Sequence, residues 1–176
     1  MIRTILVATD GSGHAKKAID LAADIAGKYG ARMVILHVLL RHTSMSDIET
    51  LCKENAMSDA LEKKFQVLRN AFLEMVPTSY VAAHMPFIVP GDVLNDVGNL
   101  ILDNARKRAA SKGVKDISAH IADGSPADVI IAAAEKENAD MIVIGSRGLG
   151  NIAGLLMGSV SHKVSHLSKR TCVAVK

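Results

Sequence analysis

Short apolar runs alternate with amphipathic segments along most of the chain. Five runs have the length and the β-branched content of buried strands: 2–9, 33–39, 116–122, 141–144 and 171–175. Four segments between them carry apolar residues at helical spacing: 15–29, 93–112, 126–137 and a segment beginning near residue 159. Strands that alternate with helices of this length need crossover connections. We therefore predict an α/β fold, with a five-stranded parallel sheet and helices on both of its faces.

One long stretch interrupts this alternation. Residues 41–92, between the second strand and the next helix, exceed the length of an ordinary connection. Within it, 48–75 has a helical composition, and four apolar side chains share one face: Leu61, Phe65, Leu68 and Phe72. Three prolines then break regular structure: Pro77, Pro86 and Pro90. We predict one domain over 1–176 with a helical insertion, which either packs on the sheet edge or forms a lid or a partner surface.

Composition and charge indicate a single domain and disfavour nucleic-acid binding. The 176 residues, 49% of them hydrophobic, suffice for the core of one domain. The net charge of +3 comes from basic and acidic residues that are mixed along the chain, and Trp is absent. Nucleic-acid binding is therefore disfavoured, because it needs a basic surface or stacking aromatics.

The apolar runs and the cysteines also indicate the cellular compartment of the protein. None approaches the roughly 20 residues that span a bilayer, and the first run is too short for a signal-peptide core. Cys52 and Cys172 lie far apart and outside any paired metal or redox spacing. We expect a cytoplasmic protein, without membrane insertion, whose two thiols are reduced and partly buried.

A glycine-rich segment follows the fourth strand. Five glycines occur within fourteen residues: Gly145, Gly148, Gly150, Gly154 and Gly158. Glycine permits positive φ and close approach of a ligand, so successive N–H groups can converge on an anion. Ser159 and Ser161 open the next helix, where free N–H groups and the helix dipole favour phosphate. The chain contains neither a P-loop nor a complete dinucleotide fingerprint.

The spacing of this segment is more informative than its glycine content. The segment contains Gly145, then two residues, Gly148, nine residues and Gly158-Ser159. This spacing resembles the nucleotide signature of the universal stress protein family, in its ATP-binding branch. The resemblance implies a Rossmann-like sheet of order 3-2-1-4-5, whose direction reverses between strands one and four. Ligands bind at such a switch point, where the carboxyl ends of these two strands meet.

The resemblance also assigns the candidate site residue by residue. Asp10 would contact the nucleoside or its metal, and the backbone at Val38 the adenine edge. Ala8 and Ile144 would pack against the base. The remaining positions carried over are Thr9, Gly145, Arg147, Gly148, Gly158, Ser159, Val160 and Ser161. The implied cofactor is ATP, with AMP or ADP as alternatives and Mg²⁺ as a candidate metal.

Several of these side chains have a plainer interpretation. Asp10 before Gly-Ser is also a good turn or capping residue. Arg147 either reaches phosphate or is a solvated loop arginine. His162 and His166 are four apart, but no third ligand accompanies them, so we expect surface histidines. His37 lies in an apolar strand, and we expect a hydrogen-bonded core residue.

Three functions remain open. We find no residue with a clear role in hydrolysis, which favours a regulatory protein that binds adenine nucleotide in a stress response. The first alternative is a slow Mg-dependent ATPase or phosphotransferase that uses Asp10 and Arg147. The second is a protein-interaction scaffold acting through the insertion. Family resemblance further implies a homodimer through the last strand, 171–175, which would lie at a sheet edge.

Overall fold

Five parallel strands form the centre of the molecule. The computed structural model describes residues 1–41, 43–75, 89–149 and 157–176. Its strands are β1 (Thr4–Ala8), β2 (Arg32–Val38), β3 (Ile117–Ala122), β4 (Met141–Gly145) and β5 (Thr171–Val175). They are ordered β3-β2-β1-β4-β5, which confirms the predicted parallel sheet and its switch point between β1 and β4. Ala8 pairs with Leu36 on one side and with Ile144 on the other, so β1 and β4 end within one residue of each other and β2 continues to Val38.

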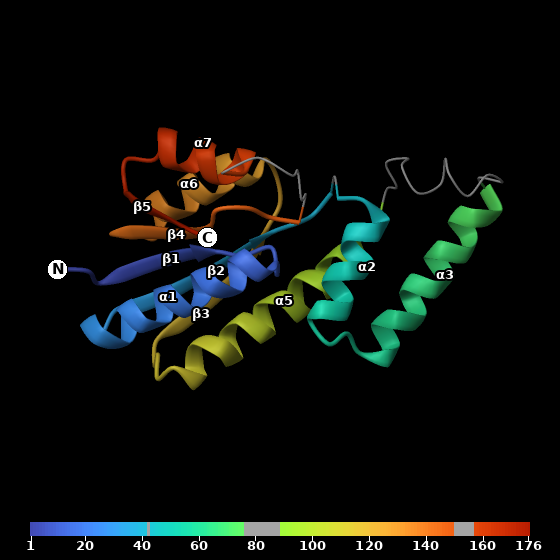
Figure 1. Ribbon diagram of the computed structural model, residues 1–176, viewed down its shortest axis with the longest axis horizontal. Helices are drawn as coiled ribbons and strands as arrows, with labels where there is room; N and C mark the ends of the chain where they lie inside the picture. Colours follow the sequence, from blue (N-terminus) through green and yellow to red (C-terminus); the bar gives the residue numbers. More distant parts are fainter. Residues whose placement is uncertain (42, 76–88, 150–156) are drawn as a thin grey trace.

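Helices cover both faces of this sheet, as predicted. The helices among the described residues are α1 (Gly13–Tyr29), α2 (Met45–Glu54), α3 (Asp59–Met75), α5 (Gly91–Ser111), α6 (Pro126–Lys136) and α7 (Ser159–Leu167). Figure 1 shows α1 and α5 on one face and α6 and α7 on the other. Successive side chains of β1 alternate between the two cores: Val7 packs with α1 and α5, whereas Leu6 and Ala8 pack with α6 and α7.

Local sequence signals fix the ends of α1. The Ser12 hydroxyl accepts a hydrogen bond from the Ala15 N–H, which caps the first turn. At the other end, Gly30 adopts a left-handed conformation with φ of 63° and donates its N–H to the Ala26 carbonyl. Glycine adopts this left-handed conformation without steric cost, which is why the helix ends there.

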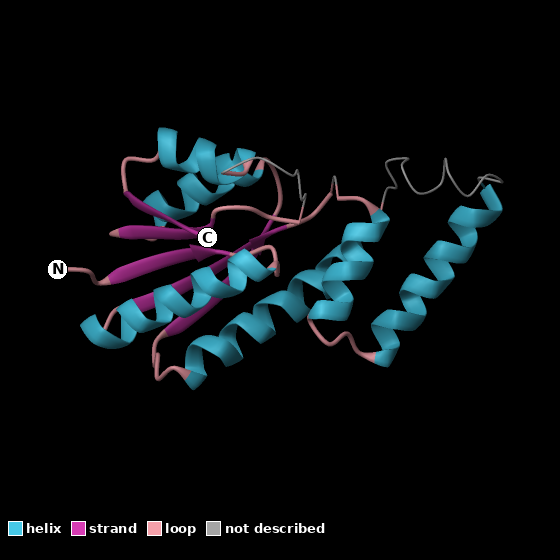
Figure 2. Ribbon diagram, viewed as in Figure 1, coloured by secondary structure: helices cyan, strands magenta, loops and turns pink. Residues whose placement is uncertain are grey.

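The described part of the insertion is largely helical, but residues 48–75 do not form one continuous helix. α2 ends at Glu54 and α3 begins at Asp59, and Ala56 between them has a φ of 53°, which no helix tolerates. Figure 2 shows the two helices beyond the end of the sheet, beside α5. Leu61 and Phe65 are buried and Leu68 is half-buried in a cluster with Leu51 and Val97. The side chain of Phe72, and Pro77 and Pro86, lie outside the described residues.

Both cysteines are free thiols, as expected. Cys52 on α2 is buried, and its burial raises the pKa of the thiol to about 11. Cys172 on β5 is half-buried. In the part of the chain that the structure describes, no helix is long and apolar enough to cross a membrane.

Candidate functional site

A cavity of about 640 Å³ opens at the carboxyl ends of β1 and β4. Every residue predicted for the site lines it: Ala8, Thr9, Asp10, Val38, Ile144, Gly145, Arg147, Gly148, Gly158, Ser159, Val160 and Ser161. The parallel register brings these positions together, although up to about 150 residues of sequence separate them. The size falls within the range of cavities that bind small molecules and cofactors, ~300–1,000 Å³.

One end of the cavity is apolar. Ala8, Val38 and Ile144 lie at the strand ends, and Ile130 of α6 lines the cavity with them. All four residues belong to the core beneath α6 and α7, and each is less than a tenth exposed. These residues therefore give the cavity an apolar wall of the kind that a heterocyclic base can contact.

The glycines of the loop were expected to provide positive φ angles and close approach of a ligand, but the structure gives Gly145 and Gly148 a different role. None of Gly145, Gly148 and Gly158 has a positive φ, so backbone freedom is not what these three positions require. A Cβ at Gly145 would lie 2.9 Å from backbone atoms of α1, and a Cβ at Gly148 would lie 2.5 Å from Oδ2 of Asp10. Gly145 and Gly148 thus allow close approach of the protein to itself. Gly150 and Gly154 lie outside the described residues.

Asp10 holds the turn after β1 and the glycine loop together. Its Oδ1 accepts a hydrogen bond from the Ser12 N–H at 3.0 Å, which closes the turn. Its Oδ2 accepts a hydrogen bond from the Leu149 N–H at 3.2 Å, which connects the turn after β1 to the loop after β4. The turn-forming interpretation of Asp10 is therefore correct in this structure, and a ligand role remains a prediction.

The start of α7 is held to the same loop. Gly158 donates its N–H to the Ser146 carbonyl at 2.7 Å, and the buried Ser161 hydroxyl donates to that carbonyl at 2.8 Å. The Ser161 hydroxyl proton thus binds the protein itself, which differs from the expectation that it faces phosphate. The exposed Ser159 and the N–H groups of the first turn of α7 remain at the cavity.

Arg147 is half-buried in the cavity wall rather than fully solvated. Its Nε is buried and has no hydrogen-bond partner among the described residues. A buried guanidinium N–H without an acceptor is unfavourable, and an anion in the cavity would supply one.

Comparison with known proteins assigns the family. The model of the universal stress protein family matches residues 1–176. The chain belongs to this family. The universal stress protein YxiE of Bacillus subtilis is 33% identical over 172 residues, which cover 98% of this chain and 96% of the relative.

Solved structures of universal stress proteins share the fold. The universal stress protein UspA from Lactobacillus plantarum superimposes with a TM-score of 0.66 at 18% identity, over 99% of this chain and 98% of its own. A universal stress protein in complex with cAMP gives a TM-score of 0.60 at 24% identity, over 99% of this chain and 97% of its own.

The rim of the cavity contains an ion pair that the sequence did not reveal. In this universal stress protein, Arg41 after β2 donates from Nε to Oδ1 of Asp123 at 2.7 Å, and a second guanidinium nitrogen contacts Oδ2. The ion pair lowers the pKa of the Asp123 carboxyl. The two residues are 82 positions apart, and only their places at the ends of neighbouring strands signalled a shared location.

The histidines match their predictions. His162 and His166 are exposed on α7, with stacked rings whose centroids are 6.2 Å apart. No group of three or more metal-ligating side chains exists among the described residues. His37 is fully buried, and its Nδ1–H donates to the Thr9 carbonyl at 2.9 Å. Burial lowers the pKa of His37, although the hydrogen bond to Thr9 and the charge of Asp10 oppose this effect.

His37 predicts a pH-dependent stability. The unfolded chain binds a proton at His37 near pH 6.5, and the folded chain only at lower pH, so the free energy of unfolding rises with pH between these values. Stability is full above about pH 6.5 and falls as the pH drops, by at most ~1.4 kcal/mol per unit for one proton. His37→Asn retains a donor toward Thr9 but does not titrate. Urea unfolding at pH 5–8 should show the wild-type advantage over this variant shrinking in acid, and a constant difference would contradict the prediction.

Proposed function

We propose that this protein is a cytoplasmic regulatory protein that binds ATP in the switch-point cavity as part of a stress response. The observation that carries the proposal is the convergence of the whole predicted set of residues on one cavity, with an apolar end and an end rich in N–H donors. Such a division suits a molecule that joins a base to phosphates.

Charge at the polar end supports a phosphate ligand. The unpartnered Nε of Arg147 and the first turn of α7 both offer donors to an anion. The universal stress protein solved with cAMP provides a precedent for an adenine nucleotide on this fold. Mg²⁺ is commonly held by one or two carboxylates together with substrate phosphates, and Asp10 could serve as such a carboxylate.

Calorimetry on the ligand-stripped protein tests this function. We expect ATP to bind at one site per chain, and GTP to bind more weakly because Val38 would present its backbone to the adenine edge. Incubation of ATP with excess protein should leave the triphosphate intact over hours. Absence of heat with ATP, ADP and AMP would overturn the proposal, whereas steady release of phosphate would favour the slow ATPase.

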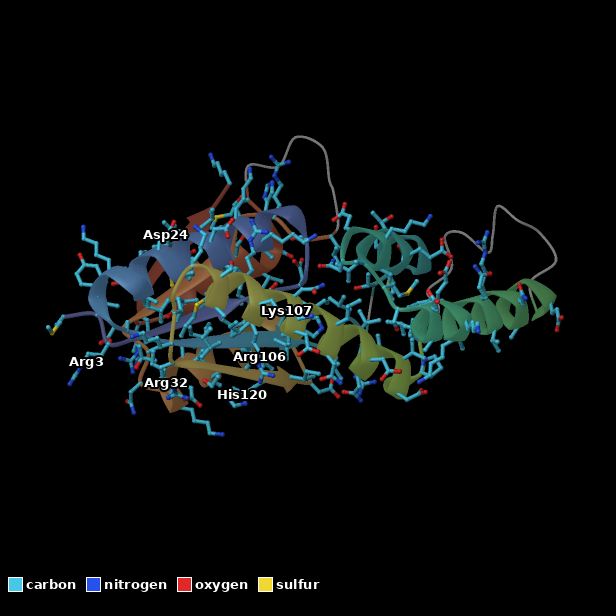
Figure 3. All side chains as sticks on the ribbon, turned by 90° about the horizontal axis from the view of Figure 1, so that it is seen from below. Arg3, Asp24, Arg32, Arg106, Lys107 and His120 are labelled. Atoms are coloured by element: carbon cyan, nitrogen blue, oxygen red, sulfur yellow. The ribbon has the colours of Figure 1, made fainter. Side chains whose placement is uncertain are left out.

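We also propose that two copies pair through β5. The two edges of the sheet differ, as the view in Figure 3 helps to show: Arg106 lies along the β3 edge and donates to the Ala119 carbonyl at 3.3 Å. This arginine comes from α5, and by bonding to a carbonyl of the edge strand it covers an edge to which another chain would otherwise pair. At the other edge, β5 pairs only with β4 among the described residues. Light scattering at micromolar protein should give the mass of a dimer, and a monomer mass would contradict this pairing.

A further inference from the structure

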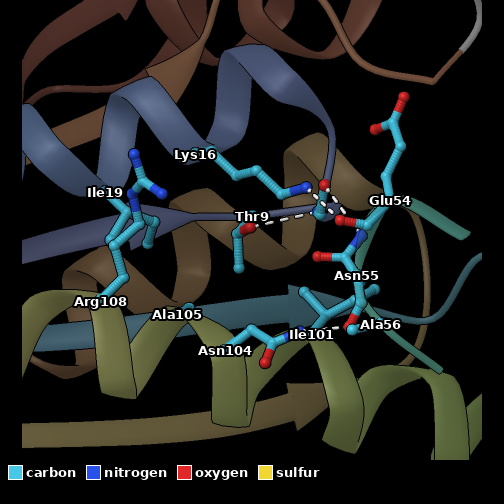
Figure 4. A pocket seen from close by; sticks show the side chains of 11 residues that line it. Thr9, Lys16, Ile19, Glu54, Asn55, Ala56, Ile101, Asn104, Ala105 and Arg108 are labelled. Atoms are coloured by element: carbon cyan, nitrogen blue, oxygen red, sulfur yellow. Dashed lines mark hydrogen bonds between the residues drawn. The ribbon is translucent and has the colours of Figure 1, made fainter. Parts of the chain in front are cut away.

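The C-terminal end of α2 is fixed by hydrogen bonds to the rest of the protein. Lys16 of α1 donates from Nζ to the Glu54 carbonyl at 3.0 Å, and Asn104 of α5 donates from Nδ2 to the Asn55 carbonyl at 2.8 Å. Figure 4 shows these side chains converging on the end of the helix. The last carbonyls of a helix have no intrahelical donor, so these contacts satisfy groups that would otherwise need water.

Asn55 itself connects α2 to the turn after β1. Its side chain is 5% exposed, and its Nδ2 donates to the Leu51 carbonyl at 2.8 Å and to the Gly11 carbonyl at 3.3 Å. Gly11 has a φ of 81°, and a Cβ there would lie 2.7 Å from Cδ1 of Leu51. The inserted helix therefore rests directly on the backbone of the turn.

One peptide unit joins this contact to the nucleotide cavity. The Gly11 carbonyl accepts from Asn55, while the N–H of the same peptide group, that of Ser12, donates to Oδ1 of Asp10. Because the peptide group is planar, fixing its oxygen also fixes the direction of its N–H. Oδ2 of Asp10 in turn accepts from Leu149 of the glycine loop. A continuous series of hydrogen bonds thus runs from the insertion to that loop.

Packing around the turn makes this series important. A second cavity, of about 290 Å³, lies on the far side of the turn, and Thr9 lines both cavities. The charged Arg108 beside it is paired with Asp20, so we assign no ligand to this space. Beside this hollow, Leu51 of α2 and Ile101 of α5 lie close to Gly11, and Asn55 adds a hydrogen bond that fixes the direction of the Gly11 carbonyl.

We propose that Asn55 is a positioning residue of the nucleotide site. It holds the Gly11–Ser12 peptide group, and through it the Asp10 carboxylate and the glycine loop, in the arrangement that receives ATP. This inference rests on the proposed function, and it gives the helical insertion, about 41–92, a role in ligand binding instead of a purely peripheral place.

Substitution of Asn55 tests the role. Asn55→Leu keeps the approximate size of the side chain but removes the donor to Gly11, and we expect ATP affinity to fall about tenfold in calorimetry. Asn55→Asp, which also lacks that donor, serves as the second variant and should weaken binding in the same direction. Asn95→Leu is the matched control, because the exposed Asn95 donates to the Gly91 carbonyl of its own helix and lies away from the turn after β1 in sequence and in fold. It should bind ATP within twofold of wild type.

A second control separates a general loss of stability from the loss of the Asn55 hydrogen bond to the turn. Ile48→Val loosens the buried face of α2 without touching the turn, and it should lower the melting temperature while leaving ATP affinity unchanged. In wild-type protein, ATP should slow amide hydrogen exchange in residues 51–57, because ATP and the Asn55 hydrogen bonds stabilise the same arrangement of the turn after β1.

The outcomes separate the two proposals. If wild-type protein binds ATP, a folded Asn55→Leu or Asn55→Asp that binds it equally well would overturn the positioning role and leave the nucleotide site intact. Unchanged exchange in residues 51–57 would also count against that role, even if neither variant folds. A wild-type protein that binds no adenine nucleotide would overturn the proposed function itself.

Discussion

Gly145→Ala should destabilise the protein by about 3 kcal/mol or more, because the added methyl group has no space. Its Cβ would lie 2.9 Å from both the Ala15 nitrogen and the His14 carbonyl carbon, which are backbone atoms at the start of α1. β4 pairs with strands on both sides, so neither the helix nor the strand can move without loss of packing or hydrogen bonds. Urea unfolding followed by circular dichroism measures the change.

A glycine on α1 itself provides the matched control. In Gly27→Ala the new Cβ would have only the Lys112 carbonyl oxygen nearby, at 3.8 Å, which is an ordinary contact. Alanine is favoured over glycine within helices by roughly 0.5–1 kcal/mol, so this variant should be slightly more stable than wild type. Equal stability of the two alanine variants would contradict the steric explanation for Gly145.

The fold was predictable because its signals are local and repeated. Each strand is a short apolar run and each flanking helix has a regular apolar face, so element type and order follow from the sequence. The strand order came from the family resemblance, and the structure confirms it. The break between α2 and α3 was not predicted: Ala56 has a φ of 53° there, and Asn55 beside it bonds to Gly11, which is 44 residues away in sequence.

The candidate site was predictable in its location and less so in its internal contacts. The residues predicted at the strand ends line one cavity, because a parallel sheet brings those ends together. Their partners were not: Gly148 lies against Asp10, and the Ser161 hydroxyl binds the Ser146 carbonyl. Such contacts depend on where loops fold back, and neither periodicity nor spacing encodes this.

The hydrogen bonds of the glycine loop also bear on the ordering cost of ligand binding. Asp10, Ser146 and Ser161 connect the described part of the loop and α7 to the strand ends. Groups that are already held in place have less conformational freedom to lose when a ligand binds. The side chains at the apolar end belong both to the cavity wall and to the core, so a steric change there should affect ligand affinity as well as folding.

Ala8→Leu should weaken ATP binding by about 100-fold, equivalent to ~2.7 kcal/mol. The Ala8 side chain lies at the apolar end of the cavity, so a larger side chain there would occupy the space proposed for the base. The unfolding free energy should also fall, by about 1–3 kcal/mol, because Ala8 belongs to the packed core beneath α6 and α7, so the affinity is compared on protein shown to be folded. Ala132→Leu places the same side chain on the exposed face of α6 and should bind ATP like wild type. Calorimetry and urea unfolding of both variants separate the two effects, and ATP affinity within threefold of wild type in Ala8→Leu would place the base elsewhere.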